Sequence, residues 1–344
     1  MLAAYANVLT IYAGLGAIFL LILVVPFVSR RIERNLEVFL LVMGFLAVLL
    51  TGRMTQDLLT KALAEPLPIS TAVLMAGFIF CLGRGCLSRF ISCFSRQAPP
   101  AVLHFTLVVV LGLSASIITA IIASLVLVEV VLVLDLDRRK QVVLSVLACF
   151  AIGLGAVLTP LGEPLSTIAC AKLQGDFFYL LGLLGYYLIP GIFFLGFLAA
   201  LNAGPSCPKG CLKGKGGWEF KEVIPRALKV YIFIVALLFL GEGFRPLMDR
   251  FIAARDARFL YWLNMVSAVL DNATLAAAEL TPGMSRKQAA GCLMGLLLSG
   301  GMLIPGNLPN IITANRLEIK SGEWARIGVP LGFGLLVVYY VLLF

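Results

Sequence analysis

The sequence predicts an all-α polytopic membrane protein, with about eight transmembrane helices and two re-entrant helical hairpins in an inverted-topology repeat. Hydrophobic residues make up 61% of the 344 residues and charged residues 13%, whereas a soluble domain carries about 25% charged residues. Runs without Asp, Glu, Lys or Arg cover residues 1–29, 98–128, 177–208 and 327–344, and about 20 apolar residues cross a bilayer core. A third observation, a duplicated segment, indicates the repeat.

The duplicated segment reads LTPLGEPLSTIACAKL at 158–173 and MLIPGNLPNIITANRL at 302–317. In each copy an apolar run is followed by a polar stretch that Gly and Pro interrupt, which we call the tip. A shorter apolar run then ends at a Lys or Arg. Each copy follows a basic tetrapeptide, at 138–141 and 285–288. Interrupted hydrophobic segments at corresponding positions of two halves are typical of the binding site of a secondary transporter. The aligned pairs include Gly162 with Gly306, Glu163 with Asn307, Ser166 with Asn310 and Lys172 with Arg316.

Apolar runs and basic loops divide the chain into an N-terminal hairpin, two repeats and a linker. The first run has no basic residue before it and is longer than the apolar core of a signal peptide, so we expect a span there. The run 100–136 is longer than one straight crossing, so we expect it to be tilted, bent or broken. The basic, half-apolar segment 84–97 predicts an interfacial amphipathic helix. The expected spans are 3–29, 35–52, 66–83, 100–136, 177–202, 230–249, 259–281 and 325–343, the hairpins 141–173 and 288–316, and the units 1–65, 66–202 (repeat 1), 203–229 (linker) and 230–344 (repeat 2).

Lysines and arginines set the expected orientation in the membrane. The net charge of +9 does not indicate nucleic acid, because the cations lie in short loops between apolar spans, as the positive-inside rule describes. If both hairpins are re-entrant and the basic linker 203–229 is cytoplasmic, most Lys and Arg face the cytoplasm. The first hairpin then opens outward and the second inward, which makes the repeats inverted. We expect a multi-pass protein of the cell membrane with both termini outside.

The two broken tips hold the first candidate ligands. In hydrocarbon, irregular backbone survives only inside protein or against a watery cavity, where free carbonyls coordinate cations and helix N-termini favour anions. The alternative is a pair of tight turns outside the membrane, which rarely lie between such apolar arms. The tip residues that supply polar groups or break the chain are Gly162, Glu163, Ser166, Thr167, Gly306, Asn307 and Asn310.

Asp271 is nearly central in the run 259–281, and Asn272 and Thr274 follow it as further oxygen ligands. An ionised carboxylate at mid-bilayer costs about 2.5–3.5 kcal/mol on insertion scales, so it needs a pathway, a partner or a proton. Asp271 and Glu163 in one aqueous pocket would repel each other, which lets one of them hold a proton and exchange it for a metal ion. The alternative is a structural Asp271 that pairs with Arg258 or Arg286. The corresponding polar positions in the other half are Ser114, Ser116 and Thr119.

The sequence leaves the role of two further carboxylates open. Glu129 and Glu279 are candidates for a proton relay, or for groups near the interface held by a basic loop. His104 is the single histidine, and the eight cysteines show no convincing ligand spacing, so we expect reduced thiols and no zinc site. The sequence contains neither a recognisable nucleophilic triad nor a G-x-x-x-x-G-K-[ST] phosphate loop, so we expect neither an enzyme nor an ATP-driven pump.

The paired tips, PLGEPLS at 160–166 and PGNLPN at 305–310, and the run LDNATLAAAE at 270–279 resemble the ion transporter superfamily. Its members include arsenite permeases, sodium/proton antiporters of the NhaD type, and sodium-coupled dicarboxylate and citrate carriers. More narrowly, the chain resembles a small prokaryotic family of predicted cation transporters of unknown function, over most of residues 66–344.

This resemblance implies a homodimer in which spans 1–3 and 6 form a scaffold. A transport domain would move against it like an elevator, with both hairpin tips at the site. Where dicarboxylate carriers have a tip of the Ser-Asn-Thr type, this chain has Glu163, and Asp271 precedes the second tip. That departure favours a cation over an anionic substrate.

The sequence therefore predicts a secondary active transporter that exchanges protons for a small cation, Na⁺ or Li⁺, with Asp271 and Glu163 as metal ligands. Hard cations prefer such oxygen ligands. One rival is a Na⁺-coupled carrier of an anion or oxyanion, such as a dicarboxylate or arsenite. Another is a channel or structural membrane subunit without coupling. The expected partners are a small inorganic ion, the lipid bilayer and a second copy of the chain, and we expect no cofactor besides the ion.

Overall fold

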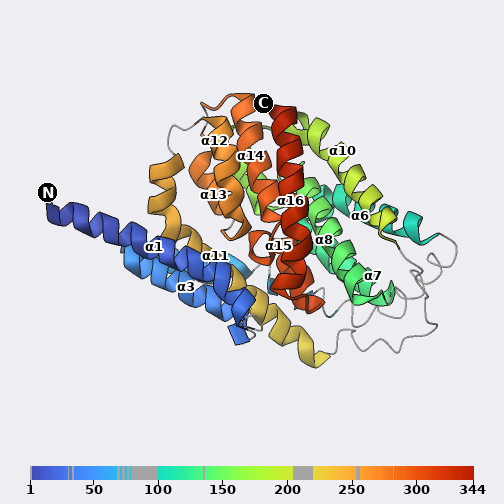
Figure 1. Ribbon diagram of the computed structural model, residues 1–344, viewed down its shortest axis with the longest axis horizontal. Coiled ribbons are helices and arrows are strands. Elements are labelled where there is room, and N and C mark those ends of the chain that lie inside the picture. The colour runs from blue at the N-terminus through green and yellow to red at the C-terminus, as the bar shows by residue number, and fades with distance from the viewer. Residues whose placement is uncertain are drawn as a thin grey trace.

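A computed structural model of the chain consists of helices joined by turns in the residues that it describes (Figure 1). These residues are 2–29, 31–32, 35–67, 70–71, 74–75, 78, 99–134, 136–203, 220–252, 256–270, 272–281 and 283–344. The predicted elements 66–83, 84–97 and 203–229 lie largely or wholly outside them, as does Asp271. The helices are α1 (Leu2–Val28), α3 (Leu36–Thr51), α4 (Gln56–Ala64), α6 (Pro100–Ile118), α7 (Ala120–Leu134), α8 (Arg138–Ala156), α9 (Pro164–Lys172), α10 (Tyr179–Leu201), α11 (Phe220–Ile252), α12 (Ala257–Leu263), the 3₁₀ helix η1 (Asn264–Ala268), α13 (Asn272–Glu279), α14 (Arg286–Gly300), the 3₁₀ helix η2 (Ile304–Gly306), α15 (Leu308–Arg316) and α16 (Ser321–Leu343).

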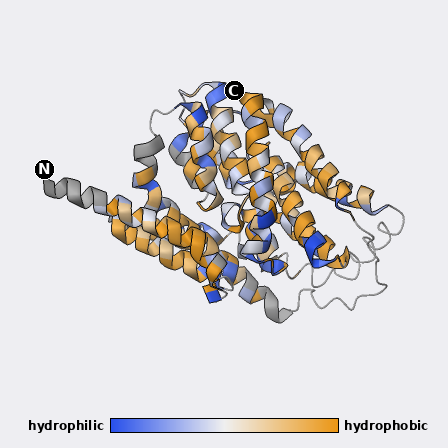
Figure 2. Ribbon diagram, viewed as in Figure 1, coloured by the Kyte–Doolittle hydropathy of each residue, from blue (hydrophilic) through white to orange (hydrophobic). Residues whose placement is uncertain are grey.

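Five described helices are long and apolar enough to cross a membrane. Figure 2 shows hydrophobic residues along most of the length of these helices. The chain is therefore that of a helical multi-pass membrane protein, as predicted. The five candidate spans are Pro100–Ile118, Arg138–Ala156, Tyr179–Leu201, Ala227–Leu247 and Ser321–Leu343, and shorter apolar helices cover Thr10–Pro26, Leu36–Thr51 and Ala120–Leu134.

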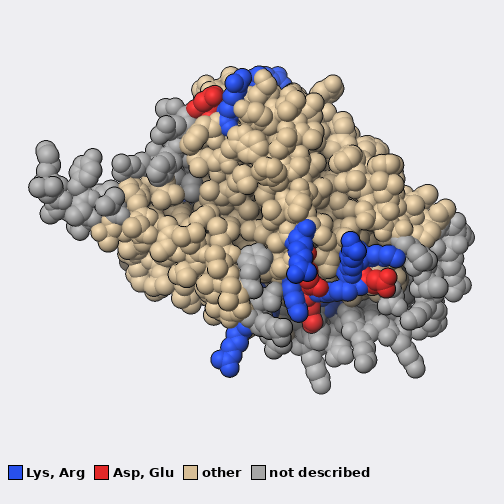
Figure 3. Space-filling view, viewed as in Figure 1, with Lys and Arg blue, Asp and Glu red and all other residues tan. Residues whose placement is uncertain are grey.

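Charged side chains mark two opposite ends of the bundle. In Figure 3 they gather at the upper edge and in the lower part of the molecule, and the described surface between them on this face is uncharged. At the first end, Arg138 pairs with Glu323, with 2.6 Å between Nη2 and Oε2. At the second end, Arg258 and Lys287 lie 5.9 and 5.4 Å from the ring centroid of Phe344. We call these the Arg138 end and the Phe344 end.

The prediction of a hairpin at 288–316 is wrong, because this segment runs along the length of α16. α14 begins at the Phe344 end, where Gly291 lies against the ring of Phe344. Beyond the turn, α15 finishes at the Arg138 end, where Leu317 O accepts a hydrogen bond from Arg138 at 2.9 Å. α14 and α15 therefore form one traverse that is interrupted near its middle.

The prediction of a hairpin at 141–173 is also wrong, because this segment too runs from one end of the bundle to the other. α8 begins at the Arg138 end, and α9 packs against α13 rather than back along α8. α10 then begins at the Phe344 end, where Gly182 O accepts a hydrogen bond from Arg286 at 3.2 Å. α8 and α9 thus cross from one end to the other. We call the turns within the two traverses the first break (157–163) and the second break (301–307).

The run 100–136 is broken, as one of the predicted options allows, and its second part folds back along the first. α6 ends at Ile118, Thr119 has φ 75° and ψ 151°, and α7 packs back against α6. α6 runs antiparallel to α10, and α7 leads directly into α8, so both outer ends of this pair lie at the Arg138 end. A β-branched residue rarely adopts a positive φ. The contacts of this tip with the first break, given below, hold it there.

The run 259–281, predicted as a span, also folds back, but from the Phe344 end. α12 and η1 lead inward from Arg258, a turn follows at 269–270, and α13 returns. At the end of α13, Glu279 Oε2 accepts a hydrogen bond from Asn264 Nδ2 at 2.8 Å, so the returning arm is again level with the start of η1. We call the two fold-backs the α6–α7 hairpin and the α12–α13 hairpin; they start from opposite ends.

α1, α3 and α11 form a layer beside this bundle (Figure 1, lower left). α3 and α11 approach closely because a glycine of each faces the other helix. A Cβ on Gly44 would lie 2.9 Å from Ala236 O, and one on Gly243 would lie 2.6 Å from the Ala47 Cβ. α11 also contacts α13 and α15, so it borders the region where the interrupted helices meet.

Candidate functional site

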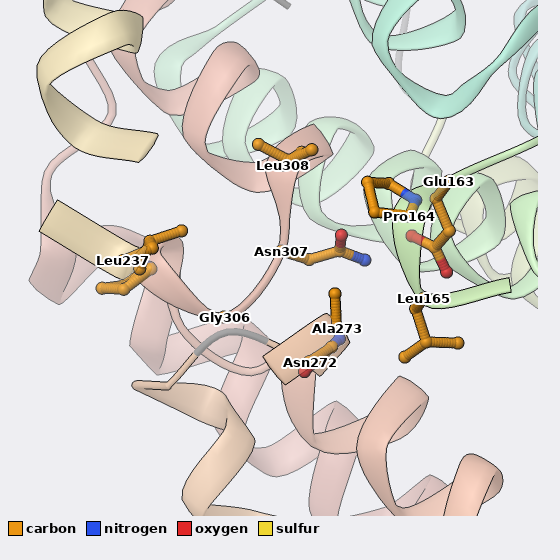
Figure 4. A pocket seen from close by; sticks show the side chains of 10 residues that line it. Glu163, Pro164, Leu165, Leu237, Asn272, Ala273, Gly306, Asn307 and Leu308 are labelled. Carbon is orange, nitrogen blue, oxygen red and sulfur yellow. The ribbon is translucent and has the colours of Figure 1, made fainter. Parts of the chain in front are cut away.

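The two breaks and the tip of the α12–α13 hairpin meet around one small cavity, shown in Figure 4. Its volume is about 30 Å³, which is room for about one or two water molecules, or for an ion that has lost most of its hydration. Its walls come from the starts of α9, α13 and α15 and from α11. The lining residues are Glu163, Pro164, Leu165, Leu237, Asn272, Ala273, Pro305, Gly306, Asn307 and Leu308.

The first break is held in place by the tip of the α6–α7 hairpin. Ala120 N donates a hydrogen bond to Gly162 O at 2.9 Å, and Thr159 Oγ1 donates to Ser116 O. A Cβ on Gly162 would overlap Ala156 O, so glycine alone fits this turn. The irregular backbone that a membrane interior cannot solvate is therefore satisfied by the neighbouring hairpin.

The second break is closed by its own side chains and by η1. A Cβ on Gly306 would lie 2.5 Å from Gly300 O and 2.9 Å from Ser267 O. Asn310 Nδ2 donates to Gly300 O at 2.8 Å and to Leu303 O at 2.9 Å. The amide of Asn310 thus clamps the turn, and Asn310 does not line the cavity.

Three polar side chains line the cavity, and each is more than nine-tenths buried. Glu163 is 8% exposed, Asn272 5% and Asn307 9%. Glu163 and Asn307 are the N-cap residues of α9 and α15, both with extended backbone. In Figure 4 the Asn307 amide points from its turn towards Glu163. Among the described residues, neither polar atom of the Asn272 side chain has a hydrogen-bond partner, so this amide is available to a bound species.

Helix N-termini surround the cavity. α9, α13 and α15 all begin with residues that line it, and the unsatisfied N–H groups of a helix start carry partial positive charge. The cavity therefore combines a carboxylate and two amide oxygens, which bind cations, with amide N–H groups, which bind anions. Both classes of small ion have ligands here.

Two predicted ligands fall outside what the structure describes. Asp271 is one, and the side chain of Thr274 is the other. Asp271 directly precedes Asn272, which lines the cavity. Its alternative partners, Arg258 and Arg286, lie at the Phe344 end. The role of Asp271 stays a prediction.

The other predicted ligands do not line the cavity and bond to nearby backbone. The Ser166 and Thr167 hydroxyls cap the start of α9, those of Ser114 and Ser116 bond within α6, and Thr119 forms the hairpin tip. The hydroxyl contacts are Ser166 Oγ to Glu163 O at 2.7 Å, Thr167 Oγ1 to Pro160 O at 2.6 Å, Ser114 Oγ to Leu111 O at 3.3 Å, Ser116 Oγ to Leu113 O at 2.8 Å, and Ile122 N to Thr119 Oγ1 at 3.5 Å.

The two relay candidates have different surroundings. Glu129 lies 3.6 Å from Arg316, and these side chains are 5% and 4% exposed. Glu279 instead accepts hydrogen bonds from two neutral groups, Asn264 Nδ2 and Cys292 Sγ, each at 2.8 Å. Neither carboxylate lines the cavity.

Sequence reasoning missed the contribution of α11 to the cavity. Leu237 lies in an apolar run without any motif, and nothing local distinguishes it from its neighbours. The Glu279–Asn264–Cys292 contacts were equally invisible, because the three residues are brought together only by the fold-back of α13. Among the described residues, no group of three His, Cys, Asp or Glu side chains is placed to hold a metal ion.

The fold and cavity define a class: a multi-pass helical membrane protein with a small polar cavity between two interrupted helices. Within that class, the chain belongs to the family described as "Protein of unknown function (DUF1646)", whose model matches residues 12–344. A search of the curated proteins found no match.

Proposed function

We propose that this protein is a secondary active transporter that exchanges protons for a small cation, Na⁺ or Li⁺, at the cavity between the two breaks. The observation that carries the proposal is the Glu163 carboxylate, buried at a cavity that the amides of Asn272 and Asn307 also line. A cation or a proton bound to a carboxylate at this depth offsets part of the cost of removing the carboxylate from water. Carboxylate and amide oxygens are the ligands that hard cations prefer, and Asp271 would add a second carboxylate.

Competition between a cation and a proton for Glu163 would couple the flux of the cation to the flux of protons. With either a cation or a proton bound, the carboxylate is neutralised and can pass a low-dielectric barrier; empty and ionised, it cannot. Each crossing then carries one of the two species, and opposite gradients drive exchange. The small volume of the cavity, about 30 Å³, fits a monatomic ion better than a dicarboxylate.

We also propose that the two halves are inverted repeats, with re-entrant hairpins at α6–α7 and α12–α13 instead of the positions predicted. Several features support this. α9 and α15 each have nine residues, and their N-caps share an extended conformation. Gln174 and Glu318 follow these helices at the same distance and have φ values of 53° and 52°. α8 starts at the Arg138 end and α14 at the Phe344 end, so the equivalent traverses run in opposite directions.

The distribution of cations supports a cytoplasmic Arg138 end. The basic linker leaves α10 at this end, and the C-terminus then lies outside; we propose the same side for the N-terminus, in the cell membrane. We further propose a homodimer in which α1, α3 and α11 form the scaffold. The bundle cations near the Arg138 end are Arg138, Arg139, Lys140, Arg316, Lys320 and Arg326, against Lys172, Arg258, Arg286 and Lys287 near the Phe344 end.

A second candidate is a Na⁺-coupled carrier of a small anion. The three helix N-termini at the cavity favour it, because their N–H groups attract negative charge. In this case Glu163 would hold Na⁺ and the amides would hold the anion. Thermal stabilisation by a dicarboxylate or by arsenite only in the presence of Na⁺ would select this candidate, whereas downhill flux insensitive to a counter-ion gradient would select an uncoupled channel.

The test is Na⁺- and Li⁺-driven proton flux in proteoliposomes loaded with a pH-sensitive dye. We expect Glu163→Gln and Asp271→Asn each to lower the flux at least tenfold, because each removes a charge that must be neutralised. Glu318→Gln is the control, since this carboxylate is exposed at the Arg138 end. The proposal fails if the wild-type protein shows no cation-dependent flux, or if both variants retain it.

A further inference from the structure

Glu279 is a buried carboxylate outside the cavity. It is the last residue of α13 and 2% exposed, and Thr281, two residues on, is exposed. Asn272, the first residue of α13, lines the cavity. At 1.5 Å per residue, the two ends of α13 are roughly 10 Å apart. Glu279 thus lies between the cavity and the surface at the Phe344 end.

The two oxygens of Glu279 have different partners. Oε2 accepts hydrogen bonds from Asn264 Nδ2 and from the Cys292 thiol, each at 2.8 Å. Asn264 Nδ2 also reaches Cys292 O at 3.1 Å, so η1 and α14 fix the donor. Oε1 is buried and has no hydrogen-bond partner among the described residues. The carboxyl group is therefore held at one oxygen and open at the other.

No described cation contacts Glu279. On α14, Arg286 and Lys287 are exposed in the first turn and are engaged with Gly182 O and the Phe344 ring. On α9, Lys172 is exposed. On α11, Glu242 is paired with Arg53 and Arg245. Within the part of the chain that the structure describes, the titratable group in contact with Glu279 is the Cys292 thiol, which is neutral as a hydrogen-bond donor.

These surroundings favour a neutral, protonated Glu279. An ionised carboxylate at this depth would lack a counter-charge, whereas its acid form loses little hydration on burial. Because Oε2 already accepts two hydrogen bonds, the proton of the acid belongs on Oε1, where no described acceptor holds it. Glu129 provides the contrast, since Arg316 lies 3.6 Å from it.

We propose that Glu279 is a proton-binding site separate from the cavity, which exchanges its proton with water at the Phe344 end. The proton leaves Oε1 for water, and the carboxylate that remains keeps its hydrogen bonds from Asn264 and Cys292. The protonation itself is independent of the proposed function. Its consequence for transport, a second proton bound in the α12–α13 hairpin close to the exchange site, rests on that function.

The direct test is infrared spectroscopy of the purified full-length protein at neutral pH, which separates the carbonyl band of a protonated carboxyl group from that of a carboxylate. Glu279→Gln should remove one protonated-carboxyl band, and the matched control Glu37→Gln, which alters a buried carboxylate paired with Lys229, should leave these bands intact. An unchanged spectrum in Glu279→Gln would overturn the proposal. If that variant does not fold, Cys292→Ala keeps Glu279 and removes one hydrogen bond to it, so its carboxyl band should shift; a band that stays in place would also overturn the proposal.

Transport separates this inference from the exchange mechanism. Glu279→Gln should retain the Na⁺-dependent rise in thermal unfolding temperature, because the cavity is intact, and lose at least tenfold of the Na⁺-driven proton flux. Full proton flux in this variant would overturn a transport role for Glu279. If the wild-type protein shows no Na⁺-dependent flux, the exchange function fails, and the infrared bands still decide whether Glu279 binds a proton.

Discussion

Buried charge is arranged differently at Glu129 and Glu279, although both lie deep in the protein. Arg316 lies 3.6 Å from Glu129 and joins α15 to α7. The corresponding cation of the other half, Lys172, is exposed, so this ion pair is a feature of one half only. The pair links the α6–α7 hairpin to the second interrupted traverse.

We expect Glu129→Gln to destabilise the protein by about 3–5 kcal/mol, because removing one partner of a buried ion pair leaves the other charge without its counter-ion. The control is Glu37→Gln. Glu37 pairs with Lys229 at 3.0 Å, but Lys229 is 37% exposed, so water can replace the carboxylate and the loss should be about 1 kcal/mol or less. Reversible unfolding in mixed detergent micelles measures both, and equal losses would contradict the distinction.

For single residues, the sequence predicts which polar side chains lie near the breaks better than it predicts which groups they contact. The Gly-, Pro- and Asn-containing tips indicate where helices break, and the structure brings Glu163, Asn272 and Asn307 to one cavity. Their binding of an ion stays a prediction. Asn310 carries the same local signal as Asn307 but clamps backbone carbonyls, because its position one turn into α15 turns it away from the cavity.

The elements show where local signals mislead. A Gly/Pro break between two apolar arms gives the same sequence signal whether the chain turns back or continues. In both cases the free backbone groups of the break must find hydrogen-bond partners nearby. The actual reversals at Thr119 and at 269–270 contain neither Gly nor Pro. They are stabilised by tertiary contacts, such as that of Ala120 N with Gly162 O. The fold class was thus predictable from composition, but the choice between hairpin and interrupted traverse was not.

The distinction between a hairpin and an interrupted traverse predicts which side of the membrane each end of the α14–α15 traverse faces. Single cysteines at Ser285 and Glu318, both exposed, should react with a membrane-impermeant maleimide from opposite sides, because α14 and α15 together cross the bundle. A re-entrant hairpin would place both on one side. Asp137→Cys is the control: it lies at the Arg138 end and should react from the same side as Glu318→Cys. Labelling of all three from one side would contradict the traverse.

The whole molecule consists of a bundle with the two hairpins and two interrupted traverses, and of the α1–α3–α11 layer beside it (Figure 1). The cavity lies where these two parts meet, because Leu237 of α11 lines it together with residues of α9, α13 and α15. An alternating-access motion that moves the bundle past the layer would separate Leu237 from its present neighbours. The position of the cavity at this junction is what an elevator mechanism requires.

Cross-linking across that junction should therefore arrest transport. A cysteine at Leu237 joined to one at Ala273, the second residue of α13, by a short bismaleimide should abolish cation-driven proton flux. Because both positions line the cavity, the double-cysteine variant is also measured without the linker; it should retain flux, which separates the effect of the link from that of the substitutions. The matched control joins cysteines at Phe45 and Phe239, whose rings are 6.2 Å apart within the α3–α11 contact. Both lie inside the layer, so this link should leave flux unchanged. Full transport with the Leu237–Ala273 link in place would mean that α11 and the bundle move as one body, and alternating access would then have to arise within the bundle, by motion of the two hairpins.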